Sequence, residues 1–548
     1  MARLTKCGWE TMHHTTNNNA ADFLLDGDAY FRRVHENLRD LLAAPAAANS
    51  YVRMAFWEFS HEAYLPSYTT GGGAHVPGCL LKDLLFDIAD KGHIIQLIAW
   101  YGTWAVRRFA AEMKTNQKLQ TWVTQTNTAH NNVGTYRNIQ AYLEQYGGNV
   151  TGCSTHQKIV IVSITGAKQA FVGGENMSQH YLSESTHNYK NWWHDTAVRV
   201  RGPVVDDIEG EWVRRWRKQN ANGPLPNTAV GIAQANAGTL SIRMATTNVE
   251  ANPVETSIRD QMILRIQNAQ NLIYLENYAL TDPILINALA ARLRGANPPT
   301  VIILVNNPAA TSLPQDFSPF SYLMFYTYAE LALIDCQSFS AVDTWRAWIT
   351  RTPNVYLNAN VQNPVMRKLG LNPNTMASFN PVNAFRYDYT YNATDKKVWL
   401  RNLWDITTNV NVMYAPQSNH PGGNKWPYPH SKLAIFDDDF LVVGTSNWTY
   451  RSMQYDGEIT LMIHDTAIAP NFVTTARDDL FEHWNQNNGF AGWSADADQN
   501  IVDFTNNAVP LEEVRIVPLR MTDFIHPASA KAWKKIVSTV GAAASAYL

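Results

Sequence analysis

The sequence has few of the features that mark disulfide-rich, zinc-binding or membrane-spanning proteins. Its four cysteines are scattered over 548 residues and form no CxxC pair, which argues against a disulfide framework or a structural zinc site. No apolar run reaches the ~20 residues that a membrane-spanning helix needs. The N-terminal segment lacks the apolar stretch of a secretory signal. We therefore expect a soluble protein, cytoplasmic or exported without a cleavable signal.

Charged residues are also few, and positively charged residues do not outnumber negatively charged ones. Charged residues make up 17% of the chain, the formal net charge is -3, and hydrophobic residues make up 45%. This is the composition of an ordinary folded protein with a large core. Nucleic-acid binders usually carry a basic footprint, so a nucleic-acid partner is not expected.

What the sequence does contain is a repeated order of helix-like and strand-like segments. In the first half, amphipathic segments 26–44 and 81–92 run into apolar segments 51–59 and 93–100; in the second half, 257–270 and 284–295 run into 271–280 and 300–308. Helical periodicity that alternates with short apolar runs is typical of α/β layering. We predict a buried, largely parallel sheet.

The repeat divides the chain into two lobes. We assign residues 1–220 to an N-terminal lobe, 221–256 to a linker rich in Asn, Ala, Pro and Gly, and 257–548 to a C-terminal lobe. The second lobe is longer between its first strand and its histidine, so it carries an insertion of about fifty residues within 309–420. The aromatic run at 317–328 there is interpreted as a buried helix rather than a lipid-facing surface.

Each lobe also contains one copy of the same short motif. The copies read His156-Gln-Lys158 closing at Gly173-Gly-Glu-Asn176, and His430-Ser-Lys432 closing at Gly444-Thr-Ser-Asn447. A single HxK has almost no weight, because chance supplies many. Two copies, each expected on a strand and each followed by a glycine-rich return to asparagine, argue against two unrelated histidines at strand ends.

The spacing within the motif predicts its geometry. Residues two apart on a strand share a face, so His430 and Lys432 should project together. The acidic cluster at 437–439 suits a hairpin turn, after which Asn447 returns beside the histidine. The first hairpin is three residues longer (156 to 176, against 430 to 447), and Ser163 stands where the second copy has Asp437.

These motifs resemble those of the phospholipase D superfamily, whose signature of HxK, Asp and a Gly-rich segment ending in Asn occurs twice. Flanking phrases extend the resemblance over most of residues 22–490: YPHSK, GTSNWTYRSM, IYLENYALTD and WHDTAVRVRGPVVDDIEGEW. The resemblance implies two similar α-β-α lobes related by a pseudo-two-fold axis, with the active site at the lobe interface.

The resemblance also implies roles for individual residues. One histidine would attack phosphorus and the other would act as acid and base, with His156 favoured as the nucleophile and His430 as the acid/base. Lysines and asparagines of both copies would hold the phosphate. Two acidic residues further on are candidates for orienting an imidazole. The remaining catalytic residues are thus Lys158, Lys432, Asn176, Asn447, Asp195 and Glu458.

Two tryptophans, the two lysines and Ser163 bear on how the site would work. Trp192 and Trp448 flank the motifs and would line the substrate site, or they are ordinary core aromatics. Two lysines already supply the electrostatic role of a cation, so neither a metal nor another cofactor is expected. Ser163 leaves open a weakened or altered first site.

The sequence thus predicts a phosphodiesterase that hydrolyses glycerophospholipid head groups, or transfers the phosphatidyl group, through a phosphohistidine. We expect a monomer that meets phospholipid at a membrane surface. Two alternatives stay open: a nuclease or small-molecule phosphodiesterase of the same superfamily, and a degenerate, non-catalytic phosphate-binding member.

Overall fold

The computed structural model describes part of the chain: residues 14–47, 49–102, 115–119, 121–123, 139–147, 153–183, 193–219, 234–278, 280, 282–305, 410–414, 428–468, 470–485, 490–493 and 517–518. Most of the predicted insertion, the aromatic run at 317–328 and Trp192 lie outside these residues.

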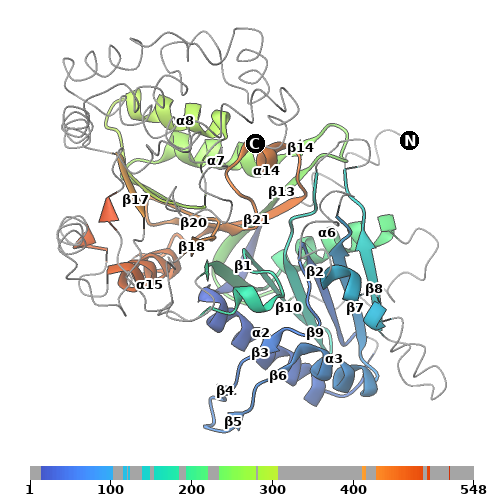
Figure 1. Ribbon diagram of the computed structural model, residues 1–548. Helices are drawn as coiled ribbons and strands as arrows, with labels where there is room; N and C mark the ends of the chain where they lie inside the picture. The colour runs from blue at the N-terminus through green and yellow to red at the C-terminus, as the bar shows by residue number, and fades with distance from the viewer. Residues whose placement is uncertain are drawn as a thin grey trace, which may run out of the picture.

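A single mixed sheet of 16 strands runs through the described part of both halves (Figure 1). From its middle toward one edge come β1 (Thr15–Leu25), β12 (Thr196–Arg201), β10 (Ala167–Gly173), β9 (Ile159–Ile164), β2 (Tyr51–Phe56), β7 (Ile94–Trp100) and β8 (Ile139–Glu144). Toward the other edge come β13 (Leu240–Asn248), β21 (Glu458–His464), β20 (Phe440–Gly444), β19 (Leu433–Phe436), β15 (Leu272–Glu276), β16 (Thr300–Leu304), β17 (Val410–Tyr414) and β22 (Val517–Pro518).

The two halves of this sheet repeat one another about its middle. The first strand of each half, β1 and β13, pair with each other. From there outward each half follows the same sequence of hairpin strands and parallel strands as far as β8 and β17, and β22 adds an antiparallel edge strand beyond β17. The four apolar segments expected as strands form β2, β7, β15 and β16, and the two motif strands form β9 and β19. The predicted pseudo-two-fold arrangement is therefore present.

The expectation of a largely parallel sheet was wrong. Only the outer strands of each half, β2-β7-β8 and β15-β16-β17, pair in parallel. The inner strands, including the pair at the middle, are antiparallel. The apolar pattern marks strands buried on both faces in either arrangement, so it could not separate parallel strands from hairpins in a covered sheet.

The predicted linker at 221–256 was also wrong at its C-terminal end. Residues 240–248 form β13, which pairs with β1 and β21 at the centre of the sheet. The Asn- and Ala-rich composition that suggested a linker stops before this strand. Beyond β13, Glu255–Thr256 form the short strand β14, which pairs with β13 and is the sixteenth strand of the sheet.

Helices cover both faces of the sheet. In the C-terminal half, α7 (Ser257–Asn268) and α8 (Pro283–Arg294) lie on one side and α15 (Phe472–Asn485) on the other (Figure 1). In the N-terminal half, α2 (Asp26–Ala43) and α3 (Leu81–Asp90) belong to one buried core. A second core is shared by α6 (Val204–Gln219) and α15 and spans the sheet of both halves.

Short elements complete the described fold. They are β3 (Tyr64–Leu65) paired with β6 (Cys79–Leu80), β4 (Tyr68–Thr69) paired with β5 (His75–Val76), β11 (Trp193–His194) paired with β18 (Tyr428–Pro429), the 3-10 helix η1 (Gln179–Tyr181), and α14 (Tyr450–Gln454). The β11-β18 pair joins the two halves away from the main sheet. No helix of the described residues has the length and apolarity needed to cross a bilayer.

Candidate active site

The two histidines lie in extended segments that pair with backbone of the opposite half. The amide of His156 donates to the carbonyl of Gly457 (2.8 Å), directly before β21. The amide of His430 donates to the carbonyl of His194 (2.7 Å) in β11. Strands β9 and β19 begin just beyond the lysines, so each HxK precedes its strand rather than lying within it. This crossed pairing brings both motifs to the contact between the halves.

Each imidazole is oriented by a carboxylate from the other half. His430 Nδ1 lies 2.6 Å from Asp195 Oδ2, and His156 Nδ1 lies 3.1 Å from Glu458 Oε1. The carbonyl of Thr445 is a further acceptor for His156 Nδ1, at 3.0 Å. Occupying Nδ1 in this way fixes the ring and leaves Nε2 for chemistry. The sequence had selected both carboxylates without pairing either with a particular histidine.

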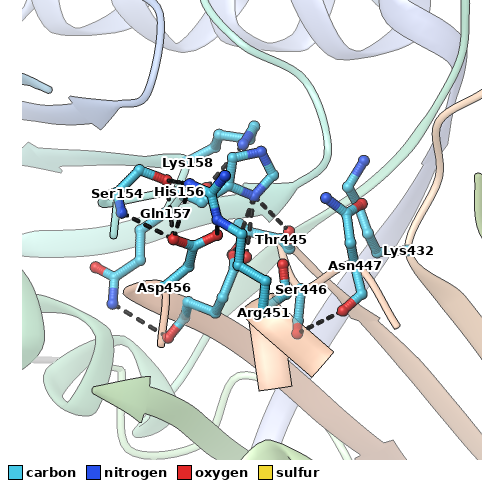
Figure 2. A network of polar contacts seen from close by, with 12 residues as sticks. Ser154, His156, Gln157, Lys158, Lys432, Thr445, Ser446, Asn447, Arg451 and Asp456 are labelled. Carbon is cyan, nitrogen blue, oxygen red and sulfur yellow. Dashed lines mark hydrogen bonds and ion pairs between the residues drawn. The ribbon is translucent and has the colours of Figure 1, made fainter. Parts of the chain in front are cut away.

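The two lysines are buried beside the histidines. Lys158 Nζ donates to the carbonyl of His156 (2.7 Å), and Lys432 Nζ lies 2.8 Å from His430 Nδ1. Figure 2 shows Lys158 beside His156 and Lys432 beside Asn447. Burial lowers the pKa of Lys158 to about 7 and that of Lys432 to about 8, although nearby carboxylates oppose the shift. Burial thus disfavours the charge on both ammonium groups.

Both imidazoles are neutral in this arrangement. Burial and then the two lysines lower the pKa of His156 well below its usual value. Burial and Lys432 lower the pKa of His430 to about 3, against the opposing effect of Asp195. Each lysine acts on both histidines, which places the four groups in one electrostatic site.

The carboxylates differ in charge state. Burial works to raise the pKa of Asp195, but His430 and Lys432 outweigh it, so this pKa is lowered and the group is ionised. Burial raises the pKa of Glu458 to about 7 despite Lys158. A Cβ at Gly174 would lie 1.8 Å from Asp195 Oδ1, so only glycine admits this carboxylate. The matching Thr445 instead donates from its hydroxyl to Glu458 (2.6 Å).

The two asparagines are not equivalent either. Asn176 Oδ1 accepts from the amide of Glu58 (3.1 Å), and its Nδ2 donates to the Tyr181 hydroxyl (2.8 Å). Asn447 Oδ1 is buried and has no hydrogen-bond partner within the part of the chain that is described. In Figure 2 Asn447 lies beside Lys432. Asn447 is thus the less constrained of the two.

Aromatic rings surround the two histidines. The ring centroids of Trp193, Tyr181 and Tyr428 lie 4.7, 5.5 and 6.3 Å from that of His430. Trp57 lies 6.1 Å from His156. Adjacency to the motif could have suggested Tyr428, and Trp57 directly follows a strand that ends at the site. Only the fold could have suggested Tyr181.

Of the two tryptophans proposed as substrate contacts, only one can be placed. Trp448 is 2% exposed, and its carbonyl accepts from the Asp282 amide (2.9 Å). This position agrees with the alternative interpretation of Trp448 as a core aromatic. Trp192 is outside the described residues.

Asp437, the acidic residue of the second motif, has a structural position. Its carboxylate accepts the backbone amides of Gln270, Asn271 and Leu272 at 2.6, 2.6 and 2.9 Å. Asp437 therefore binds the backbone at the start of β15 and does not contact a histidine. Ser163 is at the matching place in the first half, where its hydroxyl donates to the Asn49 carbonyl (2.7 Å) just before β2.

Comparison with known proteins shows what this chain is similar to. A family model described as "Cardiolipin synthase, PLD-like domain" matches residues 262–480. A probable cardiolipin synthase of Bacillus subtilis is 31% identical over 88 residues, which are 14% of this chain and 17% of the relative. Phospholipase D alpha 2 of Oryza sativa subsp. japonica is 21% identical over 314 residues, 49% of this chain and 36% of the relative.

The chain thus covers well under two thirds of the length of these relatives. Among solved structures, phosphatidylserine synthase of Haemophilus influenzae Rd KW20 superposes with a TM-score of 0.48 at 11% identity, covering 99% of both chains.

Proposed function

We propose that this chain belongs to the phospholipase D superfamily and is a phosphodiesterase that removes the head group of glycerophospholipids through a phosphohistidine, by hydrolysis or by transfer to an alcohol. The observation that carries the proposal is the crossed pair of His-carboxylate contacts, His430 with Asp195 and His156 with Glu458. Two oriented imidazoles at one site match a reaction that needs one nucleophile and one acid.

In the first step, His156 Nε2 attacks phosphorus while the bond from phosphorus to the head-group oxygen breaks. His430 donates a proton to that oxygen, because an alkoxide is a poor leaving group. The products are the free head-group alcohol and a phosphatidyl group bound to His156. In the second step, His430 takes a proton from water or an alcohol, whose oxygen displaces His156 from phosphorus.

The charges of the free site explain how His430 can become an acid. Its pKa is about 3 because burial and Lys432 disfavour the imidazolium. A bound phosphodiester brings one negative charge between Lys158 and Lys432. It offsets the lysine charges and stabilises a proton on His430, where ionised Asp195 is already in contact. The lysines then hold the non-bridging oxygens.

The difference between the carboxylates supports the assignment of roles. Asp195 is ionised and can stabilise an imidazolium on His430. Glu458 has a pKa of about 7, so it is partly protonated near neutral pH. His156 can stay neutral in this environment, and a nucleophile must be neutral at Nε2.

The substrate assay uses the full chain with EDTA present, offering phosphatidylcholine, phosphatidylethanolamine, single-stranded DNA and bis-p-nitrophenyl phosphate. Release of phosphatidic acid supports the proposal. Adding ethanol separates the two reactions, because transfer yields phosphatidylethanol and hydrolysis does not. Cleavage of DNA alone would show a nuclease, and no turnover of any phosphodiester would favour a non-catalytic phosphate-binding member. Asp437→Asn serves as the control, since Asp437 contacts only backbone.

A further inference from the structure

His194, the residue directly before Asp195, is buried between two carboxylates. Its Nδ1 lies 2.9 Å from Asp26 Oδ1 and its Nε2 lies 2.7 Å from Glu276 Oε1, and its side chain is fully buried. A carboxylate can only accept from a ring nitrogen. Both nitrogens of this ring therefore carry protons, which makes it an imidazolium.

The charge balance around the ring agrees with this geometry. Burial alone lowers the pKa of His194, but Glu276 and Asp26 reverse the shift and raise it to about 10. The same contacts hold the pKa of Glu276 below its usual range against the effect of burial. A buried charge of this kind is stable only while its partners remain.

His194 contacts the segment that carries His430 in two ways, through its backbone carbonyl and through Glu276. The His194 carbonyl accepts from the amides of His430 (2.7 Å) and Ser431 (3.2 Å). Glu276, held by the His194 side chain, also accepts from the Ser431 hydroxyl and from the Tyr274 hydroxyl (2.6 Å). Displacement of His194 would therefore move His430 through both its backbone and its side-chain contacts.

Asp26, which contacts the His194 ring, also holds the backbone of Asp195, the partner of His430. Asp26, the first residue of α2, donates from its amide to the Asp195 carbonyl (2.9 Å) while its carboxylate contacts His194. His483 of α15 contacts the same groups: its Nε2 lies 3.7 Å from Asp26 Oδ2, and its ring stacks on His194 with centroids 5.0 Å apart. Elements of both halves thus meet at one ring.

The His156 side of the site is supported differently: within the described residues no imidazole lies at the matching position. The residue that accepts from the His156 amide and precedes Glu458 is Gly457, which has no side chain. Support there comes from Asp456, which accepts from the amide and hydroxyl of Ser154 and pairs with Arg451 (Figure 2). The side chain of Arg451 is 32% exposed, so this ion pair is partly solvated.

Gln157, the counterpart of Ser431, donates to Glu211 (2.8 Å) and accepts from Arg215 (3.0 Å). Arg215 in turn forms a buried ion pair with Glu144.

We propose that His194 is a positioning residue, a permanently charged imidazolium that fixes the His430-Asp195 pair across the contact between the two halves. Its effect on catalysis rests on the function proposed above; its charge and its effect on stability do not.

The test compares His194→Asn, Glu276→Gln and the double variant, with His93→Asn as a control for loss of a buried histidine outside the site. His194→Asn leaves two buried carboxylates without their counter-charge, so we expect its melting temperature to fall. In the double variant, Glu276→Gln also removes one of these unpaired carboxylates, so we expect its melting temperature to lie above that of His194→Asn alone. A double variant that loses the sum of the two single losses would overturn the proposal.

Kinetics separate positioning from a merely structural role. In folded His194→Asn, kcat should fall about tenfold to a hundredfold with KM nearly unchanged, because the acid/base pair is misplaced while the lysines still bind phosphate. His93→Asn should leave kcat unchanged. An unaltered kcat in His194→Asn would contradict the proposal.

The charge itself can be measured without any substrate. In histidine labelled with nitrogen-15, one imidazolium signal should persist to pH 9 and be absent from His194→Asn. One side-chain nitrogen or oxygen atom each of Asp26, His194 and His483 lies within 4.8 Å of the others, a spacing that could also hold a metal ion. The metal content of the same sample is therefore measured. One equivalent of bound divalent metal that disappears in His194→Asn would overturn the imidazolium, as would the absence of any histidine protonated at pH 9.

Discussion

The two halves of the molecule present their histidines in the same way but support them differently. Each HxK segment pairs with backbone of the opposite half, and each imidazole contacts a carboxylate from that half. Behind His430 lies a buried ion network centred on the His194 imidazole. Behind His156 lie the partly exposed pair of Arg451 and Asp456 and the buried pair of Arg215 and Glu144, which reaches the motif through Gln157. The two halves therefore share the contacts that orient the histidines and differ in the charged groups around them.

The largest expected difference between the halves concerns the histidines themselves. His430→Ala should lower turnover by at least about 10³-fold, because the leaving group loses its acid. His156→Ala should lower it as much, because no intermediate forms. Only His430→Ala should accumulate phosphohistidine, detected by phosphorus NMR or by mass of the intact protein. Phosphorylation of His430 in the His156→Ala variant would reverse the assigned roles.

The two carboxylates should also differ in their effect on kcat, with the larger loss at Asp195. Asp195→Asn should lower kcat by about 10³- to 10⁴-fold, since neutral Asn cannot stabilise the imidazolium. Glu458→Gln should lower it by about tenfold to a hundredfold, since Glu458 is partly protonated and the Thr445 carbonyl still accepts from His156. Steady-state kinetics on purified variants decide this. A larger loss for Glu458→Gln would show that His156 carries the imidazolium.

The pH profile should reveal the lysines. The ammonium groups are lost as pH rises through pKa values of about 7 for Lys158 and about 8 for Lys432. Hence kcat/KM for bis-p-nitrophenyl phosphate, which is a monoanion throughout this range, should fall between about pH 7 and 9. Arginine stays charged there, so Lys432→Arg, if active, should move the fall to higher pH. A profile that stays flat to pH 9 would contradict the lowered lysine pKa values.

The smallest effect on catalysis is expected at the acidic motif position. Asp437→Asn should lower the free energy of unfolding by about 1–3 kcal/mol, because three backbone amides lose a charged acceptor. Ser163→Ala should lower it by about 0.5–1.5 kcal/mol through one lost hydrogen bond. Denaturant unfolding measures both. Per folded molecule, kcat should not change in either variant; a selective loss in one would indicate a catalytic role.

Much of the chemistry was predictable because motif spacing is local. The HxK pairs, the acidic hairpin turn, the order of helices and strands along each half and the two candidate carboxylates follow from residues near one another in sequence. Which carboxylate serves which histidine was not predictable. That depends on the contact between segments separated by 235 residues for Asp195 and His430, and by 302 for His156 and Glu458.

The sequence led to a wrong linker boundary and sheet type for a related reason. Composition describes the polarity of a segment but not its partner, so β13 was included in a linker although it pairs with β1 at the centre of the sheet. Likewise, His194 looks like any histidine in the phrase WHD. Only the fold shows that Asp26 and Glu276 lie on either side of its ring.

The sequence by itself determined that two similar halves each carry a histidine, a lysine and an asparagine in register, because periodicity and spacing are properties of short segments. The tertiary structure alone decided that the halves exchange carboxylates and that the two histidines have unequal surroundings. Burial and neighbouring charge set the charge state of each group, and both arise only when distant segments pack together.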